Sequence, residues 1–414
     1  MKLLGNGIVA QSGGPTPVIN NSVCGVIQEW LKAKCTGTLY GALYGIKGVL
    51  QEDFVDLSSQ SSEIIEGLRY TPGAALGSCR YKLKEEDYYK LLRIFKQHNI
   101  KYFFYIGGND SMDTANRVHQ LALSDNYPLK VIGIPKTIDN DLPFTDHCPG
   151  FGSAAKYLAT TVIETGIDLK GLVNNSRVVI LEVMGRNAGW LAAATALARR
   201  EEAGAPHLIC LPEVPLNKGK FLSEVERLYR EIGYVYIVAS EGLVDEKGDY
   251  LFAASCKDSF GHVQLGGLAG SLKAFIENET GIKARCNVPG TTQRSAMHLA
   301  SFTDAEEAYM VGAEAVKLAS GGRSGLMVTL TRADEDDYRC LTGNVELGKV
   351  ANVEKKIPAE WISGSGHDVT SEFINYVSPL IRGEITVPIK NGLPNYVNLM
   401  LNGFADPERQ AVGP

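Results

Sequence analysis

The residues with the clearest chemical potential lie in the segment PKTIDND at 135–141, directly after an apolar run at 130–134. Two carboxylates, Asp139 and Asp141, stand close to a lysine, Lys136, where a predicted strand ends. One carboxylate could accept a proton from a hydroxyl group while the other binds a metal ion or orients the first, and the lysine could neutralise a phosphate. A plain polar turn is the alternative interpretation, because Asp, Asn and Pro are ordinary turn residues.

Two pairs of glycines also follow predicted strands: Gly13 with Gly14, and Gly107 with Gly108. A glycine turn that opens a helix lets backbone N–H groups approach a phosphate, helped by the partial positive charge of the helix N-terminus. Such turns also occur for packing reasons, so neither pair alone assigns a phosphate site. The sequence lacks the dinucleotide fingerprint G-x-G-x-x-G and the phosphate loop G-x-x-x-x-G-K-[ST], which disfavours an ordinary NAD enzyme or a P-loop kinase.

Further polar side chains follow other apolar runs. The segment EVMGR at 182–186 ends on an arginine, a side chain that can bind a phosphate or carboxylate with two N–H groups. The segment SEG at 240–242 offers a carboxylate that could accept hydrogen bonds from sugar hydroxyls. A single arginine is most often a solvated surface residue, but several at strand ends of an acidic chain indicate a small anionic ligand. The candidates are Arg80, Arg177, Arg186, Arg285 and Arg294.

The elements that would position these residues are alternating strands and helices. Apolar runs rich in β-branched and aromatic residues predict strands at 5–10, 101–106, 130–134, 177–183 and 234–239. Helical periodicity follows residue 108, recurs from 153 through 163, and an alanine-rich helix is expected at 188–198. Strands covered on both faces and joined by helices predict a doubly wound α/β protein, in which ligands bind beyond the carboxyl ends of the strands.

The composition excludes several other classes of protein. The chain has 414 residues with 41 basic and 47 acidic side chains, a formal net charge of −6 that argues against nucleic-acid binding. This length predicts two or three folding units. The sequence contains no apolar stretch of about 20 residues, so no membrane span is predicted. The first residues lack the pattern of a secretory signal. The eight cysteines show no zinc spacing, so we expect reduced thiols in a cytoplasmic protein.

In their order along the chain, these motifs resemble the phosphofructokinase family, and within it the pyrophosphate-dependent 6-phosphofructokinases. The resemblance implies two doubly wound, Rossmann-like α/β domains with mainly parallel sheets and the active site in the cleft between them. Residues 1–150 plus about 293–340 would bind the donor, and residues 151–292 plus about 341–414 would bind the sugar phosphate. The matching segments are SGGPTPVIN at 12–20, LGSCR at 76–80, IGGNDS at 106–111, PKTIDND at 135–141, EVMGR at 182–186, SEG at 240–242 and TQR at 292–294.

The resemblance also implies a role for each residue. Asp139 would be the general base that deprotonates the 1-hydroxyl of fructose 6-phosphate, and Arg80 would stabilise charge on the transferred phosphoryl group. The donor phosphates would be held by Gly13, Gly14, Gly107, Gly108 and Ser111. The sugar phosphate and the phosphoryl group would be positioned by Thr137, Ile138, Asp141, Met184, Gly185, Arg186, Glu241, Thr291 and Arg294. Arg177 and Arg285 would reach from the neighbouring subunit of a homodimer or homotetramer.

Two side chains bear on the donor. ATP-dependent members resemble GGDG and PGTIDND, with glycines where this chain has Asp110 and Lys136. A carboxylate at Asp110 should repel the α-phosphate of ATP, while Lys136 can neutralise a bare pyrophosphate, so the resemblance implies pyrophosphate. Asn109 stands where the family usually has the aspartate of its Mg²⁺ site, and Thr291 stands where histidine or tyrosine is common. An ATP-dependent phosphofructokinase and a non-catalytic sugar-phosphate-binding regulatory subunit are the alternatives.

Overall fold

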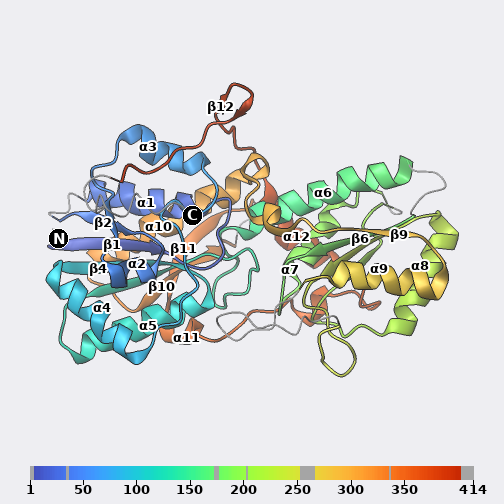
Figure 1. Ribbon diagram of the computed structural model, residues 1–414, viewed down its shortest axis with the longest axis horizontal. Helices are drawn as coiled ribbons and strands as arrows, with labels where there is room; N and C mark the ends of the chain where they lie inside the picture. Colours follow the sequence, from blue (N-terminus) through green and yellow to red (C-terminus); the bar gives the residue numbers. More distant parts are fainter. Residues whose placement is uncertain are drawn as a thin grey trace, which may run out of the picture.

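The computed structural model describes residues 4–33, 37–171, 177–201, 204–251, 266–334 and 337–401. Figure 1 shows two α/β bodies side by side, each built around its own sheet, with the carboxyl-terminal segments contributing to both. The first body contains a seven-stranded sheet and the second a four-stranded sheet. This arrangement confirms the predicted fold class of two doubly wound, mainly parallel-sheet units.

The seven-stranded sheet is parallel at its centre and antiparallel at its two edges. Its order is β11-β10-β5-β4-β1-β2-β3. The central strands β2, β1, β4, β5 and β10 run parallel, whereas β3 and β11 pair antiparallel with their neighbours. The strands are β1 (Asn6–Gln11), β2 (Leu39–Ala42), β3 (Phe54–Asp56), β4 (Ile100–Gly107), β5 (Lys130–Pro135), β10 (Leu326–Arg332) and β11 (Cys340–Glu346).

Helices cover both faces of this sheet because its strands are apolar on both sides. In β4, Phe104 and Ile106 pack into the core on one face, and Phe103 and Tyr105 into the core on the other. This near-continuous apolar pattern is typical of parallel strands buried on both faces. The first core is closed by α1 (Ile19–Lys32), α3 (Ser62–Gly67) and α10 (Phe302–Ser320). The second is closed by α2 (Ile46–Gln51), α4 (Glu85–Gln97), α5 (Asn109–Ser124) and α11 (Leu347–Val350).

The four-stranded sheet of the second body is entirely parallel, with the order β7-β8-β6-β9. Its strands are β6 (Val178–Val183), β7 (Leu208–Cys210), β8 (Val235–Ser240) and β9 (Ala284–Asn287). One face packs against α6 (Phe151–Gly171), α7 (Trp190–Ala194) and α12 (Ser371–Val377). The other packs against α8 (Lys218–Ile232) and α9 (Leu268–Thr280), which lie together in Figure 1.

The five strands predicted from the sequence are β1, β4, β5, β6 and β8, each confirmed to within about two residues. The seven-stranded sheet continues through β11, past the domain limit expected at about residue 340, because β11 pairs antiparallel with β10. The alanine-rich stretch 188–198 is not one helix as expected: α7 is followed by a 3-10 helix at Thr195–Ala198. Every residue of α7 is buried, so packing rather than alanine's helix propensity sets its length.

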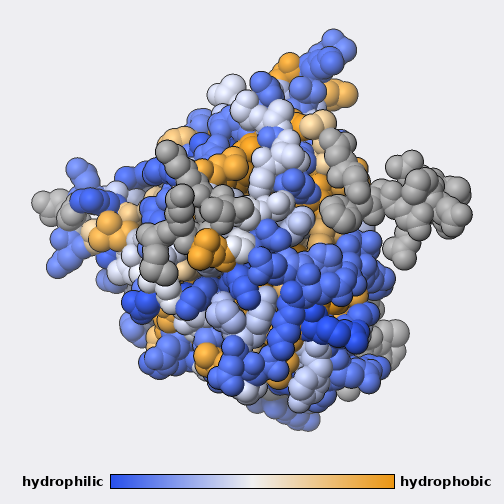
Figure 2. All heavy atoms as spheres, turned by 90° about the vertical axis from the view of Figure 1, so that its left-hand side faces the viewer, coloured by the Kyte–Doolittle hydropathy of each residue, from blue (hydrophilic) through white to orange (hydrophobic). Residues whose placement is uncertain are grey.

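The surface adds two observations. A short hairpin of β12 (Ile389–Lys390) and β13 (Leu393–Pro394) projects from the top of the molecule in Figure 1. Polar side chains cover most of the face of the first body shown in Figure 2, with apolar residues scattered among them. Among the described residues, the structure contains no helix that is both long and apolar enough to cross a membrane.

Candidate active site

Three neighbouring strands of the first body bring the two glycine turns and Lys136 to one edge of the sheet. Gln11, the last residue of β1, pairs with Ile106 of β4, and Gly107 pairs with Pro135 of β5. Parallel strands in this register end at the same level, so the segments that follow them lie side by side. The backbone N–H of Lys136 donates to Gly107 O (3.0 Å), and its Nζ donates across the edge to Gly14 O (2.7 Å).

Glycine is required at these turns by close approach as well as by backbone conformation. Gly13 has a φ of +76°, in the left-handed region, and a methyl group at Gly14 would lie 2.5 Å from a guanidinium nitrogen of Arg294. Arg294 ends a 3-10 helix, Gly290–Arg294, that follows β9 of the second body. The first glycine turn therefore faces two cations, Lys136 and Arg294, that the sequence places far from it.

Lys136 loses its proton at a lower pH than an ordinary lysine. Burial lowers its pKa from the usual 10.5 to about 8, because the ammonium ion loses solvation. The nearby carboxylates of Asp139 and Asp141 oppose this shift, while the guanidinium of Arg294 adds to it. Binding of a polyanion beside Lys136 would raise its pKa and keep it charged.

The two carboxylates of the 135–141 segment are partly buried and lie on a loop with its own hydrogen bonds. Thr137 Oγ1 accepts a hydrogen bond from Asp139 N (3.1 Å). Burial raises the pKa of Asp139, and the carboxylate of Glu241 raises it further, against the opposing effects of Lys136, Arg186 and Arg294. The pKa of Asp141 is also raised by burial and then by the charge of Asp139. A carboxylate that is harder to ionise is a stronger base for a hydroxyl proton.

The second body faces this loop with the carboxyl ends of β6 and β8. Val183 and Ser240 end these strands as paired residues, so the segments at 184–186 and 241–242 emerge together. Glu241 Oε1 accepts a hydrogen bond from Gly185 N (3.4 Å), and burial raises the pKa of Glu241. The charges of Glu241 and Arg186 both act on Asp139, although they belong to the other sheet. The candidate site is therefore composite, with acid and base groups from both bodies.

Two hydrogen bonds and a close approach at Gly185 fix the turn after β6. Gly185 has a φ of +136°, and a methyl group on it would lie 2.7 Å from Ser240 Oγ, which donates to Gly185 O (2.6 Å). The preceding N–H, of Met184, donates to Gln293 Oε1 (3.0 Å). The segment of Met184, Gly185 and Arg186 is thus tied both to β8 and to the 3-10 helix that carries Arg294.

Several predicted residues have other surroundings in this chain. Arg177 precedes β6, at the end of the strand opposite to Met184, and its Nε donates to Gly233 O (2.7 Å). Arg285 pairs in register with Val179 at the same end and bonds Asp168 of α6 (2.6 Å). Both arginines therefore lie at the amino end of β6, whereas Met184 follows its carboxyl end.

The remaining predicted residues are distributed around the site. Arg80 is exposed. The pKa of Arg294 is lowered mainly by the burial of Arg294 itself and next by the positive charge of Arg80. Thr291 lies exposed on the same 3-10 helix as Arg294, whereas the side chain of Ile138 packs into the apolar core of the second body. Ser111 is buried against Gly107, where an added methyl group would lie 2.1 Å from Ser111 Oγ.

The first turn of α5 carries Asn109 and Asp110. Asp110 is exposed, and Asn109 uses both polar atoms of its side chain. Asn109 Oδ1 accepts from Asn352 N (2.5 Å), and Asn109 Nδ2 donates to Val353 O. An amide oxygen has two lone pairs, so one acceptor position of Asn109 remains for another ligand.

Comparison with known proteins identifies this architecture. The sequence model of the phosphofructokinase family matches residues 6–319, which span both sheets as far as α10. The chain belongs to the phosphofructokinase family.

Its relatives are similar along nearly their whole length. The pyrophosphate–fructose 6-phosphate 1-phosphotransferase of Halomonas elongata is 44% identical over 401 residues, covering 95% of this chain and 96% of that protein. The enzyme of the same name from Xanthomonas campestris pv. campestris is 45% identical over 403 residues, with 95% and 96% covered. The crystal structure of a pyrophosphate-dependent phosphofructokinase from Marinobacter aquaeolei superposes with a TM-score of 0.89 at 44% identity, covering 97% of this chain and 98% of that one.

Two residues that position the site of this phosphofructokinase family member were missed by the sequence analysis. Asn140 lies between the two aspartates with a φ of +54°, and its Nδ2 donates to Tyr376 OH (2.9 Å). Gln293 accepts from Met184 N and donates to Gly290 O (2.9 Å). Asn140 and Gln293 both lie inside motifs that had been recognised, so a search for neutral polar residues within those motifs would have found them. Tyr376 is more than 200 residues away and had no local signal.

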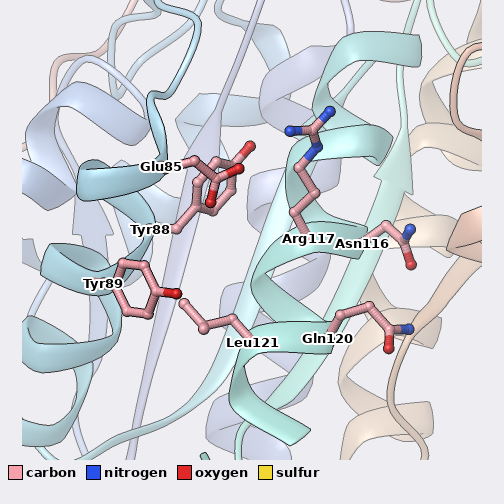
Figure 3. A pocket seen from close by; sticks show the side chains of 7 residues that line it. All are labelled: Glu85, Tyr88, Tyr89, Asn116, Arg117, Gln120 and Leu121. Carbon is pink, nitrogen blue, oxygen red and sulfur yellow. The ribbon is translucent and has the colours of Figure 1, made fainter. Parts of the chain in front are cut away.

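A separate hollow of about 290 Å³ lies between α4 and α5 (Figure 3). It has one guanidinium, Arg117, and one carboxylate, Glu85, together with two tyrosines and an amide-bearing face of α5. The remaining lining residues are Tyr88, Tyr89, Asn116, Gln120 and Leu121. None of the residues assigned to the family's chemistry lines it, so we do not place the reaction there.

Proposed function

We propose that the chain transfers a phosphoryl group from pyrophosphate to the 1-hydroxyl of fructose 6-phosphate, giving fructose 1,6-bisphosphate and phosphate in a reversible reaction. The observation that carries the proposal is the contact between Lys136 and the first glycine turn. Its buried Nζ bonds Gly14 O and lies among Asp139, Asp141 and Arg294. A buried cation at a glycine-lined phosphate turn suits a compact, highly charged donor.

Asp139 would act as the general base. It accepts the proton of the 1-hydroxyl as the oxygen attacks the nearer phosphorus of pyrophosphate, and the bond from that phosphorus to the bridging oxygen breaks. The leaving group is inorganic phosphate, and Asp139 returns the proton in the reverse direction. The raised pKa of Asp139 supports this role because the base and the hydroxyl are then better matched.

The cations of the first body would stabilise the charge that spreads over the transferred and leaving groups. Lys136 and Arg80 would supply positive charge, and the N–H groups at Gly13, Gly14, Gly107 and Gly108 would bind phosphate oxygens, with Gly108 at the start of α5. Asp110 would exclude the α-phosphate of a nucleotide by charge repulsion. These roles make the seven-stranded body the donor-binding domain.

Mg²⁺ fits the oxygen ligands present. Asp139 raises the pKa of Asp141, which indicates crowded negative charge that a divalent cation would balance. We propose that Asn109 would hold the ion through the free lone pair of its Oδ1, together with Asp141. The bound ion would neutralise part of the phosphate charge.

The second body would bind the sugar phosphate. Glu241 would accept hydrogen bonds from sugar hydroxyls, Met184 to Arg186 would line the ring, and Thr137 would orient the reacting groups. Arg294 and Thr291 would contact the 6-phosphate. Arg177 and Arg285 would complete a neighbouring subunit's site, which the position of both residues at the amino end of β6 supports. We therefore propose a homodimer or homotetramer; the free thiols of the described cysteines support a reducing, cytoplasmic location.

A donor comparison with purified protein tests the proposal. Turnover of fructose 6-phosphate is measured with Mg²⁺ and equal concentrations of pyrophosphate or ATP, with Asp139→Asn as the control for contaminating enzymes. We expect rapid turnover with pyrophosphate and little with ATP. A preference for ATP would establish the ATP-dependent alternative, and sugar-phosphate binding without turnover on either donor would indicate a regulatory subunit.

A further inference from the structure

A four-residue segment, 352–355, crosses from the first body to the second beside the candidate donor site, and we call it the strap. It begins just after α11 and passes the first turn of α5. Asn352 N donates to Asn109 Oδ1 (2.5 Å), Val353 O accepts from Asn109 Nδ2, and Asn352 Nδ2 donates to Asp113 (3.4 Å). The near end of the strap is thus pinned over the start of α5.

The far end of the strap is held by the loop of the two aspartates and by the second body. Lys355 N donates to Asp141 O (2.7 Å), and Lys355 O accepts from Trp190 Nε1 (3.0 Å). Glu354 accepts from Asn187 Nδ2 (2.6 Å) in the turn after the EVMGR segment. Both ends of this short segment are therefore fixed, which leaves it little freedom to move away from the site.

Asn109 is the residue whose chemistry fits the strap. Its amide group accepts from one backbone N–H and donates to the next backbone C=O, a pairing that a carboxylate cannot make. An aspartate here would set a negative oxygen against the Val353 carbonyl, and the second bond would be lost. These two hydrogen bonds give a structural reason for asparagine at position 109, where the family usually has aspartate.

We propose that the strap is a specificity wall of the donor site, positioned by Asn109, that limits the donor to two phosphates. This inference rests on the proposed function. The donor phosphates bind at the turn of Gly107 and Gly108, and the next residue of the chain is Asn109, which carries the strap. The strap is bound to the first residue of α5, and Asp110 is the second, so both would limit the room for a third phosphate or a nucleoside beyond this turn. The carboxylate of Glu354 adds negative charge along the strap.

The test compares donors of increasing length in variants of Asn109. Asn109→Asp keeps an oxygen ligand for Mg²⁺ but cannot donate to Val353, and Asn109→Ala loses both bonds. Asn116→Ala is the matched control, because Asn116 lies on the same helix and faces Gly348 rather than the strap. For each protein, kcat/KM is measured with pyrophosphate, tripolyphosphate and ATP, all with Mg²⁺.

We expect both Asn109 variants to raise the ratio of kcat/KM for tripolyphosphate to that for pyrophosphate at least threefold, about the effect of one hydrogen bond. The control should leave the ratio unchanged. An unchanged ratio in Asn109→Asp overturns the proposal, and so does a change in Asn109→Ala alone, which would mark a metal ligand. If neither variant folds, Glu354→Gln, which keeps a hydrogen-bond acceptor, must raise the same ratio for the proposal to stand. A wild type that does not use pyrophosphate defeats the proposed function instead.

Hydrogen exchange gives a second readout that does not depend on turnover. The amide N–H groups of Asn352 and Lys355 are bonded in the strap, and we expect Asn109→Ala to speed exchange at both. Faster exchange at Asn352 alone would mean that the strap does not move as a unit and would contradict a wall pinned by Asn109.

Discussion

At the scale of single residues, the site places a lysine that is easily neutralised beside an aspartate that is easily protonated. Both shifts arise from the same burial, which penalises charge of either sign. Each group partly restores the charge of the other. The site is therefore most reactive in the pH range where Lys136 is still protonated and Asp139 is already ionised.

The first prediction concerns the base. We expect Asp139→Asn to lower kcat by about 10²–10⁴-fold, because an amide cannot accept the hydroxyl proton, while binding of fructose 6-phosphate is largely retained. Steady-state kinetics and equilibrium binding measure the two effects. Asp125→Asn, a surface carboxylate paired with Lys96, is the control. An unchanged kcat would remove Asp139 from the role of base.

The second prediction is a bell-shaped pH dependence of kcat/KM for pyrophosphate. The raised pKa of Asp139 puts the acid limb above pH ~4, the usual value for aspartate, because the base is lost on protonation. The lowered pKa of Lys136, about 8, sets the alkaline limb, because the cation is lost on deprotonation. In Lys136→Arg the guanidinium stays charged, so the alkaline limb should move to higher pH. An alkaline limb that stays in place in this variant would assign it to another group.

At the scale of elements, α12 supports the loop between β5 and α6. Tyr376 OH accepts from Asn140 Nδ2 and donates to Asp146 O (2.8 Å), and Asn140 Oδ1 accepts from Cys148 N (2.9 Å). These bonds fix the backbone between Asp139 and Asp141, where Asn140 adopts the left-handed conformation. A helix near the carboxyl end of the chain thus sets the geometry of the two carboxylates.

The third prediction follows from this support. Tyr376→Phe should lower kcat about tenfold while changing KM little, and it should cost about 1–2 kcal/mol of stability from the unpaired Asn140. Kinetics and denaturant unfolding measure both. Tyr338→Phe is the matched control, since Tyr338 OH donates to Glu307 (2.5 Å) rather than to the Asn140 side chain. Equal losses of kcat in the two variants would show that only stability is involved.

At the scale of the whole molecule, buried charges join the loop after β5 to α10 and β10. His147 lies between Asp146 (2.8 Å) and Glu307 (2.6 Å), and Arg332 also contacts Asp146 (3.1 Å). Burial disfavours charge on His147, but Glu307 and Asp146 outweigh it and raise its pKa from 6.5 to about 9. A buried ion network of this kind links stability to pH.

The fourth prediction is the direction in which the stability of the protein changes with pH. Because the folded-state pKa of His147 is above the unfolded value, its stabilisation is complete below pH ~6.5 and is lost as the pH rises through about 9. The free energy of unfolding of the wild type should therefore fall between pH 6.5 and 9.5 by an amount on the order of 2–3 kcal/mol. The Tm should fall with it. In His147→Gln this part of the fall should disappear. Identical pH slopes in the two proteins would contradict the assignment.

The fifth prediction concerns assembly. If Arg285 completes a neighbouring subunit's site, Arg285→Ala should raise the KM for fructose 6-phosphate about tenfold or more, as expected for a lost charge-assisted contact. Asp168→Ala is the control, because it removes the bond within the chain but keeps the guanidinium. Equal effects of the two variants would limit Arg285 to that bond. Sedimentation should show a dimer or larger, and a fully active monomer would refute the assembly.

The sequence by itself determined the strands, the turns and the types of reactive residue. Near-continuous apolar runs predict parallel strands from the local sequence. The glycines and charged residues that follow β4, β5 and β6 can be recognised in the sequence alone. The single helix expected at 188–198 was wrong because burial of α7 overrode alanine's intrinsic preference.

Only the tertiary structure decided which groups share one site. The contacts of Lys136 with Gly14, of Glu241 with Asp139 through charge, and of Asn109 with the strap each join segments about 100 or more residues apart. Tyr376 and the strap carry no local signal, because residues that act through hydrogen bonds to distant segments show no sequence periodicity. Their effect depends on burial and on contacts between distant segments, which arise only when the two bodies have folded side by side.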